Sequence, residues 1–212
     1  KTNIGGASMK RTKLKDRILP KYSKGEEIFN MTSHIVGGAL GIVALVLCVV
    51  FAAIHHNGYG VVSGAIYGVT MILLYTMSSI YHGLKPERFS KKVFQVLDHC
   101  SIFLLIAGSY TPFCLCTFRE YNTALGWTIF GIIWAIAILG IVYLIIRMYL
   151  ENDAMIKARY LAKEYMEEKE ISTKEEIEKM IQQYDIVNDL GIKCVHYQLA
   201  LNVLAKIAIL SL

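Results

Sequence analysis

Long apolar runs dominate the chain as far as Arg147. No Asp, Glu, Lys or Arg occurs from Ile28 to Leu84, from His99 to Phe118, or from Tyr121 to Ile146. A membrane-spanning helix needs roughly 20 mostly apolar residues, so the first run is long enough for two helices, separated at His55–Gly60. The pattern predicts four spans: Asn30–Ile54, Gly60–His82, Val96–Cys116 and Leu125–Met148.

The composition agrees with this prediction. The chain is 55% hydrophobic and 18% charged, which is too apolar for an ordinary soluble domain. The apolar runs are also too long for the strands of an outer-membrane barrel, and they lack the alternating pattern of such strands. The predicted fold class is therefore all-α, a multi-pass transmembrane helix bundle followed by a charged helical tail.

Two of the predicted spans carry small residues at intervals of four. Gly37 and Gly41 lie in the first span, and Gly60, Gly64 and Gly68 lie in the second. Glycine at this spacing lets two helices approach closely in lipid. The pattern predicts packing between spans of one chain, and packing between copies in a homo-oligomer is the alternative.

Basic residues indicate how the bundle is oriented. An N-terminal arm, residues 1–29, is strongly basic, and its first eight residues look like a leader ahead of Met9. The connection after span two is also basic, through Lys85, Arg88, Lys91 and Lys92. The other two connections carry only Arg119, which Glu120 offsets. Because positive residues stay on the cytoplasmic side, we expect a multi-pass protein of the plasma membrane with a cytoplasmic N-terminus.

The net charge of +5 is explained by the same residues. In a membrane protein such charge indicates topology and contact with anionic lipids. We therefore expect membrane lipids as partners and no nucleic acid.

Polar side chains collect at the predicted cytoplasmic ends of three spans. They are Glu27, Asn30 and His34 at span one, Ser78 and His82 at span two, and Asp98 and His99 at span three. The first three follow one stripe of a helix, and the span-two pair shares one face. Asp98 and His99 are adjacent and point roughly 100° apart, so only one of them can face a shared site.

Ionisable groups inside a membrane indicate function by default. An imidazole such as His82 can bind zinc, a carboxylate such as Asp98 can hold a metal-bound water, and a hydroxyl such as Ser78 can donate to a developing oxyanion. The cluster predicts metal-assisted hydrolysis. A Ser-His-Asp hydrolase triad is a weaker variant, because no nucleophile-elbow sequence surrounds Ser78.

Each of these residues also has a structural interpretation. His34 could hydrogen-bond a neighbouring helix, and Asp98 could pair with a loop lysine or cap span three. Glu27 could be a favourable charge at a helix N-terminus. Asn30 could be the N-cap of the first helix, and Ser23 is an equally good candidate.

Three motifs in order, "EEIFNMTSHIVGG", "SSIYHGL" and "VLDHCSIFLLIAGSYTPF", closely resemble the hemolysin III family. This family is the bacterial branch of the progestin and adiponectin receptor proteins, related to alkaline ceramidases. The resemblance runs from about Leu14 to about Val142. It implies a seven-helix membrane fold, a cytoplasmic N-terminus and zinc near the cytoplasmic face.

The resemblance also implies roles for residues. His82 would be a zinc ligand, Ser78 would line the site and Asp98 would hold a zinc-bound water. Glu27, Asn30 and His34 match the family's first block, with a structural or supporting role. The implied activity is hydrolysis of an amide in a lipid such as ceramide. A receptor-like role in lipid homeostasis and a pore-forming, cytolytic activity are the alternatives.

The chain departs from the family pattern after about Val142. The pattern supplies two more zinc-binding histidines as H-x-x-x-H in the seventh helix, and this sequence contains no H-x-x-x-H. His196 is one histidine where two are needed. The segment after Val142 is therefore interpreted as a fragment, a fusion or a frame-shifted end of a family member.

The predicted tail, residues 149–194, is highly charged. We expect two amphipathic helices that start in the cytoplasm, the first from Glu151 to Glu170 and the second after a capping box formed by Ser172 and Glu175. The second helix has an apolar stripe at Ile177, Met180, Ile181, Tyr184 and Val187. The tail is a candidate surface for a protein partner. The last segment, residues 195–212, is predicted to be a marginal fifth span or an interfacial helix.

Overall fold

The computed structural model describes residues 13–191, and the chain within these bounds is helical, with no strand. It divides into two compact units. One unit is Tyr22–Tyr149. The other combines the N-terminal segment up to Lys21 with the chain from Leu150 onwards. The predicted segment 195–212, with His196, lies outside the described residues.

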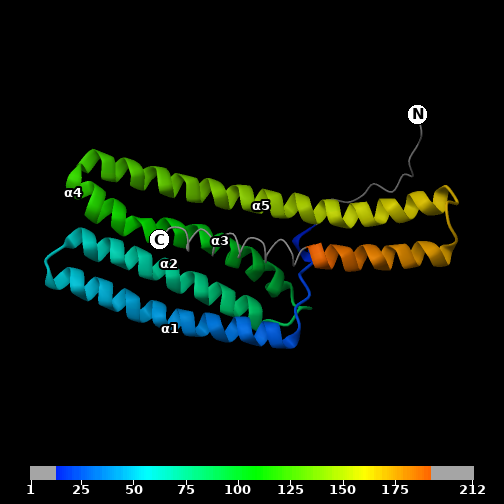
Figure 1. Ribbon diagram of the computed structural model, residues 1–212, viewed down its shortest axis with the longest axis horizontal. Helices are drawn as coiled ribbons and strands as arrows, with labels where there is room; N and C mark the ends of the chain where they lie inside the picture. Colours follow the sequence, from blue (N-terminus) through cyan, green and yellow to red (C-terminus); the bar gives the residue numbers. More distant parts are fainter. Residues whose placement is uncertain (1–12, 192–212) are drawn as a thin grey trace, which may run out of the picture. The chain divides into compact units, whose positions relative to one another are not determined.

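The chain forms a series of helices, of which α1 to α5 are labelled in Figure 1. They are the short helix η1 (Leu14–Asp16), α1 (Lys24–Ile54), α2 (Gly58–Gly83), α3 (Phe89–Pro112), the π-helix η2 (Phe113–Phe118), α4 (Arg119–Tyr121) and α5 (Thr123–Glu168). A further helix covers residues 174–191. Between residues 13 and 191, four helical stretches are long and apolar enough to cross a membrane: Lys24–Ile54, Gly58–Gly83, Phe89–Tyr121 and Thr123–Glu168. The all-α, multi-pass prediction is confirmed.

Glycines set the packing of α1 against α2. A Cβ added at Gly68 would lie 2.6 Å from Leu45 Cβ, and one added at Gly64 would lie 3.0 Å from Cys48 Cβ. Neither site has room for a side chain, so α1 and α2 approach closely along this line. The glycine ladder thus packs two spans of the same chain.

The interior of the bundle lies between α2 and α3 and is small and polar. Ser63, Thr70, Ser101 and Thr111 are all buried, and their hydroxyls mostly bond to carbonyls of their own helix. The large apolar side chains face outward instead. Leu40, Phe51 and Leu139 are about two-thirds exposed, at 63%, 65% and 67%, as expected for helices whose solvent is lipid.

The helix starts differ from the predicted spans because of local hydrogen bonds. α1 begins at Lys24 and not at Asn30, since Ser23 caps it. Ser23 Oγ accepts from the backbone N–H of Glu26 at 3.2 Å, and the Glu26 carboxylate accepts from the backbone N–H of Ser23 at 2.6 Å. Of the two candidate caps, Ser23 is correct.

α3 begins at Phe89 and not at Val96, so Lys91 and Lys92 belong to the helix and not to the connection before it. Asp98 therefore lies inside α3 and does not cap it. Beyond Pro112 the chain continues as the π-helix η2.

The second unit contains the charged tail. α5 runs unbroken to Glu168, so the expected helix start at Glu151 is wrong; no turn residue interrupts the chain there. The N-terminal segment is attached to this unit, because the Asn152 side-chain oxygen accepts from the backbone N–H of Ile18 at 2.9 Å and Lys21 pairs with Asp189 at 2.6 Å.

The cap of the last described helix is shifted by one residue from the prediction. Thr173 Oγ1 accepts from the Glu176 N–H at 3.4 Å, and the Glu176 carboxylate accepts from the Thr173 N–H at 2.9 Å. The sequence offers two overlapping boxes, and the Ser172–Glu175 one is not used. The helix then buries Ile177 and Ile181.

Candidate functional site

One carboxylate joins three helices at the end of the bundle where α1 begins. Glu27, in the first turn of α1, places Oε2 2.7 Å from His82 Nδ1 on α2. Its other oxygen, Oε1, accepts from Lys91 Nζ on α3 at 2.7 Å. Glu27 thus links residues that are 55 and 64 positions away in sequence.

Lys91 is buried, with its side chain only 1% exposed. Besides the Glu27 carboxylate, its ammonium donates to the backbone carbonyls of Tyr81 at 3.1 Å and Leu84 at 2.9 Å. Those carbonyls belong to the last turn of α2 and its C-cap, where carbonyls have no partner within the helix. All three ammonium protons therefore have acceptors, which is the condition under which a buried charge is tolerated.

The Glu27 contact fixes the tautomer of His82. A carboxylate only accepts hydrogen bonds, so Nδ1 carries the proton and Nε2 of the neutral ring is left as an acceptor or metal ligand. Aromatic rings surround the imidazole. The centroid of Tyr81 lies 4.7 Å away, that of Tyr22 lies 5.7 Å away, and the His34 ring is parallel to it at 6.0 Å.

The other predicted residues lie around this network. Ser78 is buried one turn before His82 on α2. Asp98, on α3, lies within electrostatic range of His34 and 3.8 Å from His99 Nδ1. His99 Nδ1 is itself 2.7 Å from the Gln95 carbonyl oxygen on its own helix.

The structure therefore brings Glu27, His34 and His82 together as the spacing predicts. Asn30 does not join them: in the part of the chain that the structure describes, only its backbone carbonyl takes part in a side-chain hydrogen bond, accepting from Ser33 Oγ at 3.0 Å.

Sequence reasoning missed Lys91, which was interpreted as a cytoplasmic loop charge. One signal could have identified it. Lys91, Gln95 and Asp98 are spaced i, i+4, i+7, which is one stripe of a helix. Gln95 is buried as well, so this polar stripe faces the interior of the bundle.

The zinc site expected from the sequence needs several ligands close together. Between residues 13 and 191, no three His, Cys, Asp or Glu side chains are grouped so that they could hold one metal ion. A catalytic zinc commonly has three protein ligands, and here His82 Nε2 is one suitable donor. The described residues alone therefore do not fit a catalytic zinc site.

Comparisons with known proteins cover the whole Tyr22–Tyr149 unit and extend beyond it. The expected end of the family resemblance at about Val142 is therefore too early. A sequence profile described as "Haemolysin-III related" matches residues 22–164. "Hemolysin-3" of Bacillus cereus is 44% identical over 118 residues, which is 56% of this chain and 52% of that protein. "Hemolysin-3 homolog" of Bacillus subtilis (strain 168) is 40% identical over 118 residues, or 56% of this chain and 54% of that protein. The chain thus spans about half the length of these relatives. No solved structure matches it significantly.

Proposed function

The chain belongs to the haemolysin III family of membrane proteins, and from this membership we propose that it hydrolyses an amide bond in a lipid at the Glu27–His82 network. The observation that carries the proposal is the 2.7 Å contact between Glu27 Oε2 and His82 Nδ1. In the neutral ring this contact takes the Nδ1 proton, so Nε2 of a largely buried imidazole is available as an acceptor or metal ligand in a membrane-spanning bundle.

The neighbouring residues suit amide hydrolysis. Ser78 is one helical turn from His82, and its hydroxyl is a suitable donor to the oxygen of an amide carbonyl. Asp98 is a carboxylate suited to orienting a water molecule. Lys91 holds Glu27, and through it His82, in place.

Zinc would supply an activated water in such a reaction. We propose zinc as the cofactor, with His82 Nε2 as one ligand; residues 13–191 do not complete the site by themselves.

The test is hydrolysis of a fluorescent ceramide by the detergent-purified protein, with bound zinc measured in parallel. We expect His82→Ala to remove both activity and zinc, and Ser78→Ala to lower activity about 100-fold while zinc is retained. Ser109→Ala is the matched control, because Ser109 is a half-buried serine of α3 whose hydroxyl bonds to the carbonyl of Ile106 on its own helix. Activity that survives both His82→Ala and chelation would exclude the proposal.

A second candidate function is membrane perturbation, and it is favoured by the names of both relatives. It predicts dye leakage from liposomes to which the protein is added. Leakage should be the same for His82→Ala and the unchanged protein, since a pore does not need this imidazole. Leakage that disappears in His82→Ala would count against this candidate.

We also propose that the protein lies in the plasma membrane with its N-terminus in the cytoplasm. The basic residues ahead of α1 and between α2 and α3 support this orientation. Labelling with a membrane-impermeant thiol reagent checks it, in a variant whose five native cysteines are replaced by serine. A cysteine introduced at Glu120 should react in intact cells, and one introduced at Lys85 should not.

A further inference from the structure

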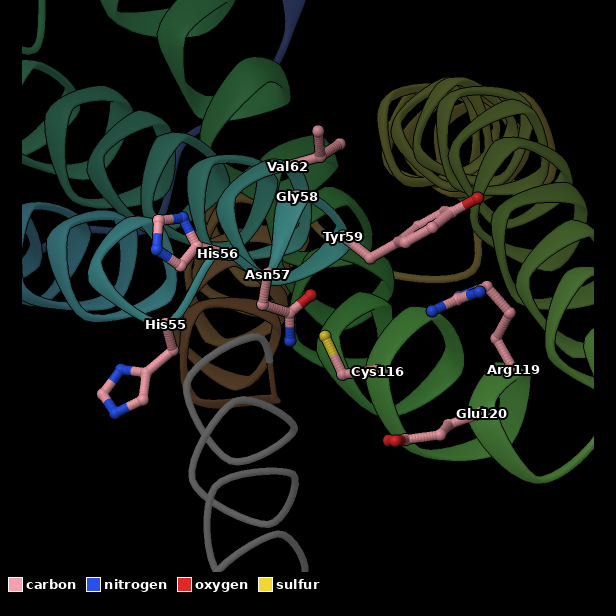
Figure 2. Close-up of a pocket in the computed structure, with 9 residues that line it drawn as sticks. All are labelled: His55, His56, Asn57, Gly58, Tyr59, Val62, Cys116, Arg119 and Glu120. Atoms are coloured by element: carbon pink, nitrogen blue, oxygen red, sulfur yellow. The ribbon is translucent and has the colours of Figure 1, made fainter.

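A second polar region lies at the opposite end of the bundle, where α1 meets α2 and η2 meets α4. It is a cavity of about 660 Å³, which is within the usual range of about 300–1,000 Å³ for sites that bind small molecules. Its walls include Asn57, Tyr59 and Val62 from the start of α2, and Arg119 and Glu120 from α4. Figure 2 shows these side chains.

Arg119 is held rigidly at one side of the cavity. Its guanidinium carbon lies 3.5 Å from the centre of the Tyr59 ring, and its Nε donates to the Leu115 carbonyl at 2.8 Å. Within residues 13–191, no hydrogen bond uses the two terminal nitrogens of the stacked guanidinium. The terminal nitrogens point into the space between Tyr59 and Cys116 (Figure 2), in a fork that matches phosphate oxygens.

Glu120 supplies the opposite charge. Its carboxylate lies below Cys116 in this view and points away from the Arg119 guanidinium (Figure 2). Within residues 13–191, neither Arg119 nor Glu120 forms an ion pair. The cavity, which His55 and His56 also line, therefore presents a guanidinium and a carboxylate that do not neutralise each other. A zwitterion carries the two complementary charges.

The surroundings of the cavity match the headgroup level of a membrane. Tyr59 and Trp127 contact each other edge-to-face at 6.5 Å, and such rings are enriched where a bundle meets the polar part of the bilayer. Val62 forms an apolar wall of the cavity, and its side chain is 52% exposed. Val69, two turns further along α2, is also apolar and 56% exposed. An acyl chain attached to a bound headgroup would continue along this apolar surface.

We propose that this cavity binds the headgroup of a phospholipid that carries phosphoethanolamine, with Arg119 on the phosphate and Glu120 on the ammonium. A primary ammonium donates hydrogen bonds to a carboxylate. Choline cannot do so and is normally bound on aromatic faces, and Arg119 already covers the face of Tyr59. This site is separate from the Glu27–His82 network and does not depend on the hydrolase proposal.

The experiment measures lipid binding by native mass spectrometry of the full chain in detergent. The probes are dioleoyl lipids with ethanolamine, choline or glycerol headgroups, and soluble phosphoethanolamine. We expect the ethanolamine lipid to bind at least fivefold more tightly than the choline lipid. Arg119→Ala should weaken both the ethanolamine and the glycerol lipid about tenfold. Glu120→Gln should weaken only the ethanolamine lipid.

Glu87→Gln is the matched control, since Glu87 is an exposed carboxylate in the connection between α2 and α3, and it should leave every affinity unchanged. If Arg119→Ala does not fold, Glu120→Gln decides alone. Equal binding of the three lipids, or unchanged ethanolamine-lipid binding in Glu120→Gln, would overturn the proposal. Soluble phosphoethanolamine that binds as tightly as the lipid would overturn the assignment to a membrane lipid.

Discussion

The buried lysine offers the sharpest test of the packing described above. Lys91→Met keeps a long apolar stem but removes an ammonium with three acceptors. Removing one partner of a buried ion pair costs about 3–5 kcal/mol. Glu27 keeps its contact with His82 and is 17% exposed, so we expect the lower end, about 3 kcal/mol. This corresponds to roughly a 150-fold shift of the folding equilibrium.

The assay is reversible unfolding in mixed detergent and dodecyl sulfate, followed by circular dichroism. Lys85→Met is the control, because Lys85 is an exposed lysine in the connection before α3, and it should change the free energy of unfolding by less than about 0.5 kcal/mol. Combining Lys91→Met with Glu27→Gln measures the coupling between the two residues, which we expect to be about 2 kcal/mol. A coupling energy near zero, or equal effects of Lys91→Met and Lys85→Met, would refute the reasoning.

Three further outcomes are expected. Gly68→Ala should cost about 1–3 kcal/mol, because its Cβ would lie 2.6 Å from that of a leucine on α1, whereas Gly131→Ala meets nothing within 4 Å and should be neutral; unfolding free energies in detergent compare the two. Thr173→Ala should cost the helix 174–191 about 1 kcal/mol and raise amide exchange in its first turn about fivefold, while Ser172→Ala should have no effect if the cap is assigned correctly. The hydrogen bond from Arg159 lowers the pKa of Asp185 in the folded protein. The Asp185 carboxylate therefore stabilises the tail fully above the unfolded-state pKa of about 3.9. This stabilisation is lost as the pH falls through the lower pKa of the folded state. Exchange in residues 174–191, corrected for intrinsic rates, should accelerate below about pH 4, and Asp185→Asn should remove that acceleration; the same acceleration in the variant would contradict this assignment.

The number and type of the membrane helices were predictable from sequence, because apolar runs of this length have few alternatives. Their starts were not, because hydrogen bonds of single residues decide them. Ser23 and Asn30 are equally good caps by type, and only the contact with Glu26 distinguishes them. The overlap of Ser172 and Thr173 in two capping boxes produced a one-residue error for the same reason.

The candidate site was predictable in part. Helical spacing correctly placed Glu27 and His34 beside His82. The same reasoning missed Lys91, because a lysine next to a loop is usually solvated and counts as a topological charge. Its burial depends on where α3 begins and on the carbonyls at the end of α2 that accept from its ammonium. A residue pattern specifies neither.

The π-helix η2 has a consequence for how insertions and deletions act on this protein. A π-helical turn holds one more residue than an α-helical turn. The six residues of η2 therefore change the direction in which the side chains of the following helix, α4, point around the helix axis. Deleting one residue from Phe113–Phe118 would restore an α-helical register and rotate Arg119 and Glu120 by about 100° around the axis. A single-codon deletion there would leave the apolar pattern intact and still turn both charges away from the cavity.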